Sequence, residues 1–107
     1  MNLSNFTIKS QEAIQKAIDL TSANSQQAIE PTHLLKGIVT EGESVVNFLF
    51  QKLGVNSATI LTIVDKDIES YPRVSGGGEP YLSRESNAVL QKAVELSGKM
   101  GDQFVSL

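Results

Sequence analysis

The sequence contains no cysteine, no tryptophan and a single histidine. Without cysteine the chain can form no disulfide, thiol nucleophile or cysteine-ligated metal site, and one histidine is too few for a transition-metal centre. No Lys-Ser or Lys-Thr pair follows the glycines at 76–78, as a phosphate-binding loop requires, so we interpret this run as a linker. His33 stands among leucines and is expected to be a packing or surface-polar residue rather than a base or a metal ligand. We therefore predict no catalytic residue, no metal and no cofactor in this chain.

The chain also lacks a large excess of either positive or negative charge. The net charge is −3, and acidic and basic residues are interspersed, which argues against a nucleic-acid partner because such modules carry a basic face. No uncharged run approaches the roughly 20 residues that span a bilayer, and the first residues lack the basic and apolar regions of a secretory signal. The sequence therefore predicts a cytoplasmic protein that binds neither nucleic acid nor membrane.

One segment occurs almost twice. Residues 12–20 resemble residues 88–96, and the shared Lys16 and Lys92 lie 76 positions apart (92 − 16). The pairs that are identical at this offset are Ser10/Ser86, Gln15/Gln91, Lys16/Lys92, Ala17/Ala93, Leu20/Leu96 and Gln27/Gln103. A gapless match of this length indicates a duplicated structural unit. Because the second copy stops at Leu107, we expect one complete repeat and the opening of another, within one small domain.

Apolar residues recur at three- and four-residue steps, which is typical of amphipathic helices. We predict five helices, near residues 7–23, 31–40, 44–53, 57–70 and 83–99, and no strand. The expected N-caps are Thr7, Ser44, Asn56 and Ser83. The expected organisation is a first repeat at 1–71, a glycine-rich linker at 72–81 and the start of the second repeat at 82–107, with the fifth helix packed on the first repeat. The fold class is all-α.

Four stretches resemble one known family. Residues 6–13, 28–38, 73–78 and 101–105 are similar, in order and spacing, to the N-terminal domain of the Clp family of AAA+ unfoldases. The stretch 72–78 is most similar to the disaggregase branch of that family. The resemblance implies an eight-helix domain of two four-helix Clp repeats related by a pseudo-twofold axis, of which the second repeat is truncated here.

The resemblance also implies a function. It indicates a stress-response chaperone domain that engages unfolded or aggregated polypeptides and passes them to the hexameric ATP-driven ring of its parent protein. ATP and Mg²⁺ would belong to that parent, because the ATPase modules and their Walker motifs are missing here; this chain is not expected to be an enzyme. The alternative is the N-domain of a protease regulator of the same family, which docks adaptors or degradation-marked substrates.

The resemblance places Thr7 and Asp102 among the residues that engage clients. A hydroxyl and a carboxylate at helix ends can bond to a peptide backbone without reading its side chains. Leu90 and Leu96 of the fifth helix would add apolar surface beside them. A purely structural interpretation stays open, because Thr7 is a plausible N-cap and Asp102 a plausible turn residue.

The incomplete second repeat suggests one more property. The fifth helix carries the apolar residues Val89, Leu90, Ala93, Val94 and Leu96. In a complete fold these residues would be shared between the first repeat and the missing helices. We therefore expect part of this surface to be exposed, and the chain to self-associate or to be poorly stable.

Overall fold

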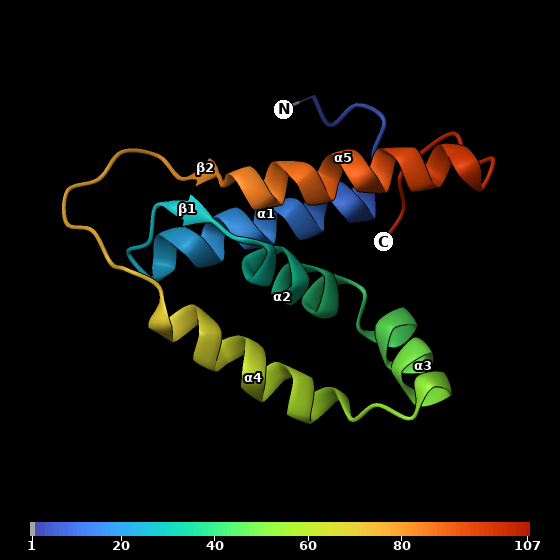
Figure 1. Cartoon of the computed structure of the whole chain (residues 1–107), viewed down its shortest axis with the longest axis horizontal. Coiled ribbons are helices and arrows are strands. Elements are labelled where there is room, and N and C mark those ends of the chain that lie inside the picture. The colour runs from blue at the N-terminus through green and yellow to red at the C-terminus, as the bar shows by residue number, and fades with distance from the viewer. Residues whose placement is uncertain (1) are drawn as a thin grey trace.

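Five helices and two very short strands make up the computed structural model, which describes residues 2–107 (Figure 1). The elements are α1 (Ile8–Ala23), β1 (Ala28–Ile29), α2 (Pro31–Glu41), α3 (Glu43–Leu53), α4 (Ser57–Ser70), β2 (Tyr81–Leu82) and α5 (Arg84–Lys99). The five predicted helices are confirmed to within one residue at each end. None of the helices in the described residues has the length and hydropathy for crossing a bilayer.

The helix ends show why these segments are helical. Thr7 and Ser83 begin α1 and α5, and their hydroxyls accept the backbone N–H of Ser10 and Ser86 at 3.1 Å. Asn56 caps α4 in the same way, with its side-chain oxygen on two N–H groups of the first turn. Each cap satisfies a donor that the helix leaves unpaired. The predicted caps at these three positions are confirmed.

The predicted cap at Ser44 is wrong, because α3 begins directly after α2. Gly42 ends α2, its N–H donating to the carbonyl of Ile38, and its own carbonyl accepts the N–H of Val46 at 2.8 Å to open α3. Gly42 therefore caps the end of α2 and the start of α3, and α3 has already begun when the chain reaches Ser44. Gly42 is buried against Leu107, whose side chain would lie 2.6 Å from a Cβ at this position.

The core lies where α1, α2 and α5 meet (Figure 1). Its buried residues are Phe6, Ile14, Ala17, Ile29, Leu34, Leu90 and Val105. The two helices α1 and α2 approach each other closely at Gly37 of α2, where a Cβ would lie 2.2 Å from the carbonyl oxygen of Ala13 on α1. Leu90 brings α5 into this core, which confirms that the fifth helix packs on the first repeat.

The prediction of no strand is wrong for two segments of two residues each. β1 and β2 pair in parallel, with Ala28 opposite Tyr81 and Ile29 opposite Leu82. Two residues are too few to show the alternation by which a strand is found in a sequence. They pair because each precedes a helix that packs on the shared core, so that the two approaching chain segments run side by side.

A second parallel pairing reveals the duplication in space. Phe6 forms an isolated bridge with Val105, and at the offset of 76 these residues correspond to Leu82 and Ile29. The Thr7 N–H donates to the carbonyl of Val105 at 3.0 Å, and the equivalent Ser83 N–H donates to the carbonyl of Ile29 at 3.1 Å. The segment before the first helix of each repeat therefore pairs with the segment after the first helix of the other repeat. This exchange is what a pseudo-twofold axis produces.

The ends of α1 and α5 repeat the same geometry. Ser25 and Gly101 both have positive φ, 55° and 75°. The next residue in each case donates its N–H to a carbonyl five positions earlier, Gln26 to Thr21 at 2.9 Å and Asp102 to Ser97 at 2.8 Å. This is the Schellman arrangement that closes a helix. Asp102 is thus the structural counterpart of Gln26, although the two side chains differ.

Residues 72–80, between α4 and β2, contain neither helix nor strand. The start of this stretch is nevertheless held to the end of α1. The Arg73 guanidinium donates to the carbonyl of Asn24 at 3.0 Å, and the Val74 N–H donates to the carbonyl of Ser25 at 2.8 Å. The linker therefore leaves the first repeat along a fixed path before it reaches its glycines.

Candidate functional site

Thr7 is held rigidly at the N-terminus of α1. Its backbone N–H donates to Val105, and its partly buried hydroxyl donates to the Ser10 hydroxyl at 3.0 Å while accepting the Ser10 N–H. A threonine hydroxyl has one hydrogen to donate and two lone pairs. The cap uses the hydrogen and one lone pair. Only one acceptor position of Thr7 therefore remains for a ligand.

Asp102 lies in the turn that carries the chain from α5 back to this point. Its backbone is fixed by the bond to Ser97, whereas its carboxylate is exposed and forms no hydrogen bond or ion pair within residues 2–107. Three residues later Val105 pairs with the segment before Thr7. The structure therefore brings the turn of Asp102 and the start of α1 into one region, and both side chains offer hydrogen-bond acceptors there.

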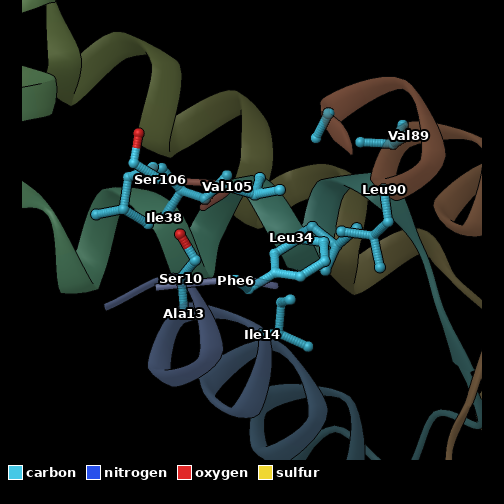
Figure 2. A pocket seen from close by; sticks show the side chains of 12 residues that line it. Phe6, Ser10, Ala13, Ile14, Leu34, Ile38, Val89, Leu90, Val105 and Ser106 are labelled. Carbon is cyan, nitrogen blue, oxygen red and sulfur yellow. The ribbon is translucent and has the colours of Figure 1, made fainter. Parts of the chain in front are cut away.

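An apolar pocket of about 100 Å³ lies next to Thr7, because Phe6, Ser10 and Val105 are among its lining residues; Thr7 and Asp102 themselves do not line it. Figure 2 shows its walls: Phe6 and Ile14 come from the first segment and α1, Leu34 from α2, and Leu90 from α5. The segment 105–107 closes one side. Thr7 is bonded to Ser10 and Val105, and both of these line the pocket. The arrangement is a small apolar hollow with polar acceptors near its edge.

The two leucines predicted for the site have different positions. Leu90 is only 6% exposed and forms part of the core, so it can contact a ligand only as a wall of the pocket. Leu96 is 47% exposed and does not line the pocket. Val89, which is 46% exposed, stands at the rim instead. The part of Thr7, Asp102, Leu90 and Leu96 in client binding stays a prediction.

Sequence reasoning missed most of the pocket wall. Phe6, Leu34, Val105 and Leu107 line it and were not singled out. A signal existed for part of this set, because Val105 corresponds to the buried Ile29 at the repeat offset. The convergence of Phe6 and Leu34 depends on how α1 and α2 cross, which no local pattern specifies.

His33 is fully buried and belongs to a structural network. Its Nδ1 accepts the N–H of Glu30 at 2.9 Å, and its Nε2 lies 2.7 Å from the side-chain oxygen of Gln26. Burial lowers the pKa of His33 from 6.5, and this outweighs the opposite effect of the Glu30 carboxylate. No group of three or more potential metal ligands exists in the described part of the chain.

The comparisons with known proteins agree on one family. The family model described as "Clp repeat (R) N-terminal domain" matches residues 5–107. The chaperone protein ClpB of Bacteroides thetaiotaomicron is 63% identical over 107 residues, which is 100% of this chain and 12% of that protein. ClpB of Porphyromonas gingivalis is 57% identical over the same shares of both chains. The chain thus spans 12% of the length of these curated relatives.

The fold agrees with a solved structure of low sequence similarity. The Hsp104 N-terminal domain from Candida albicans has a TM-score of 0.86 to this structure at 19% identity, over 96% of this chain and 68% of that one. At that identity the likeness concerns the fold alone. It supports the arrangement of α1, α2 and α5 described above.

Proposed function

The chain belongs to the family of Clp repeat N-terminal domains, and from that membership we propose that it is the substrate-engaging domain of a ClpB-type protein disaggregase. In this role it binds unfolded or aggregated polypeptides in the cytoplasm and delivers them to the hexameric AAA+ ring of its parent. ATP and Mg²⁺ act in that ring, and this domain contributes binding only.

The observation that carries the proposal is the 63% identity to a ClpB chaperone over the whole of this chain. The alternative, a ClpC- or ClpA-type protease regulator that docks adaptors or degradation-marked substrates, has no comparable observation in its favour. The geometry adds support of a different kind. An unfolded client offers backbone N–H groups and apolar side chains in no fixed order, so its binder needs acceptors and an apolar surface that do not read a sequence.

The region around Thr7 has both features. The free lone pair of Thr7 and the exposed carboxylate of Asp102 can each accept a client N–H, and a bond to a charged acceptor contributes more than one between neutral groups. An apolar side chain of the client can enter the pocket between Leu34 and Leu90. Burial of one such side chain contributes about 1.5–3 kcal/mol, whichever apolar residue it belongs to.

The test is the binding of a fluorescently labelled, permanently unfolded polypeptide to this chain, followed by anisotropy. We expect Asp102→Ala to weaken binding about tenfold, because a charged hydrogen bond of 1.5–3 kcal/mol is lost. Thr7→Ser keeps the cap and removes the methyl group, so any weakening cannot come from a lost cap. Asp67→Ala is the matched control, since it removes an equally exposed carboxylate from α4.

Melting curves of the same variants separate binding from stability. The proposal requires Asp102→Ala to weaken binding while its melting temperature stays at the wild-type value. Equal weakening by Asp67→Ala would mean that net charge alone attracts the client. Unchanged binding by Asp102→Ala would show that Asp102 is a turn residue and that clients bind elsewhere.

A further inference from the structure

A buried side-chain network joins the ends of three helices, α1, α2 and α4. Gln26, just after α1, donates from its side-chain amide to the carbonyl of Ile68 in the last turn of α4 at 2.6 Å. Its side-chain oxygen meets Nε2 of His33 in α2. Gln26 and His33 are both buried, and no buried side-chain polar atom in the described residues lacks a partner.

The hydrogen bonds determine where the proton of His33 lies. The Glu30 N–H donates to Nδ1, so Nδ1 carries a lone pair and the proton is on Nε2, from which it is donated to Gln26. A second proton has to be placed on Nδ1. It would point at the Glu30 N–H from 2.9 Å away, so that two donors face each other without an acceptor.

We infer that His33 is a proton-sensitive latch, which connects the first turn of α2, through Gln26, to the end of α4 when neutral and breaks that connection when protonated. Protonation removes the acceptor of the Glu30 N–H. The imidazolium then has to move toward water, because a buried charge without a partner is strongly unfavourable. Once the ring moves, Gln26 loses the bond that orients its amide, and Ile68 loses its tie to α1.

The surroundings of His33 contain few groups that could hold the imidazolium in place. The Glu30 carboxylate is the one group that raises the pKa of His33, and burial outweighs it. From the end of α4, the Tyr71 ring lies 5.4 Å from the imidazole, and its hydroxyl is engaged with Thr32 at 2.7 Å. The group facing His33 from the α1 side is the neutral amide of Gln26. Further along α2 and α4, Lys36 and Asp65 are already paired with each other.

The direction of the pH effect follows from these contacts. Burial lowers the pKa of His33 when α2 and α4 are closed, and exposure to water in the open form returns it toward the ordinary histidine value of about 6.5. The latch is therefore fully closed above pH 6.5. As the pH falls below 6.5 the open form takes up a proton first, and the closed form loses population until the pH reaches the lowered pKa.

The test is hydrogen exchange of the whole chain measured by NMR between pH 7.5 and 5.5. The Glu30 amide is the reporter, because its bond is to His33. The Leu90 amide in α5 is the reference. After correction for intrinsic exchange, we expect the protection of Glu30 to fall up to about tenfold by pH 5.5, since one group that titrates only in the open form shifts an equilibrium tenfold per pH unit.

His33→Gln is the matched variant. Glutamine offers an acceptor for the Glu30 N–H and a donor for Gln26, as in an ordinary capping box, but does not titrate. Its Glu30 protection should be independent of pH. The proposal is overturned if wild-type protection is constant, if the variant loses protection equally, or if Glu30 is as strongly protected as Leu90 throughout, since both amides would then open only by global unfolding. Should the variant not fold, ¹⁵N spectra of the wild-type imidazole decide: a proton on Nδ1 at pH 7, or titration at or above 6.5, contradicts the latch.

Discussion

Substitution of Gly37 by alanine tests the close packing of α2 against α1. A Cβ at this position would lie 2.2 Å from the carbonyl oxygen of Ala13 and 3.4 Å from the backbone nitrogen of Ala17. Both are backbone atoms of α1, so no side chain can rotate away. The helices have to separate by about 1 Å, which places this change at or above the upper end of the roughly 1–3 kcal/mol that overpacking costs.

Part of that cost is offset. Alanine favours a helix over glycine by about 1 kcal/mol, so the net loss of unfolding free energy for Gly37→Ala should be about 2 kcal/mol. For a domain of this size that corresponds to a melting temperature lower by roughly 8–16 °C. Circular dichroism at 222 nm measures both quantities, the free energy in a urea titration and the melting temperature in a thermal scan, since the helices provide the signal.

Gly98→Ala is the control. Gly98 lies within α5, and a Cβ there would meet no atom within 4 Å. The same chemical change should therefore stabilise the chain by up to about 1 kcal/mol. The two variants have opposite expected signs, which removes helix propensity as an explanation. A Gly37→Ala chain as stable as the wild type would refute the close contact between α1 and α2.

The remaining predictions concern the join between the repeats and the surface of α5. Ser86 is fully buried and donates to the carbonyl of Ile29 at 2.6 Å, so Ser86→Ala should lower the unfolding free energy by about 1–2 kcal/mol in urea titrations; a loss no larger than that of the exposed Ser70→Ala would contradict this. Val89, Val94 and Leu96 are all more than 40% exposed on α5, so we expect a mass that rises with concentration in light scattering, and a constant monomer mass would rule that out.

Much of the fold followed from local patterns. The match of Lys16 to Lys92 predicted the duplication, and the structure shows it in the equivalent bonds of Thr7 and Ser83 to the opposite repeat. Capping residues set the helix starts because a side chain acts on N–H groups only two or three positions away. The cap at Ser44 failed for the same reason: the shared turn at Gly42 is decided by how α2 and α3 join, which lies outside that local range.

Contacts between distant segments were beyond such reasoning. His33 was expected to be a packing or surface-polar residue, yet its hydrogen bonds depend on Gln26. Through Gln26 they also depend on Ile68, which lies 42 positions after Gln26 in the chain. The pocket likewise depends on the crossing of α1 and α2. Leu90 was predicted to present apolar surface, but an apolar residue in a helical pattern does not reveal which of its neighbours will cover it. The client site was predicted from family resemblance rather than from a local pattern.

Chemical-shift mapping tests the proposed function most directly. An unlabelled, permanently unfolded polypeptide is titrated into the ¹⁵N-labelled chain, and the amide shifts are followed to saturation. We predict the largest changes at Thr7, Asp102, Val105 and Val89, because Val89 and Val105 line the apolar pocket and Thr7 and Asp102 carry the proposed acceptors. Changes confined to α3 and α4, or no saturable change at all, would contradict the account.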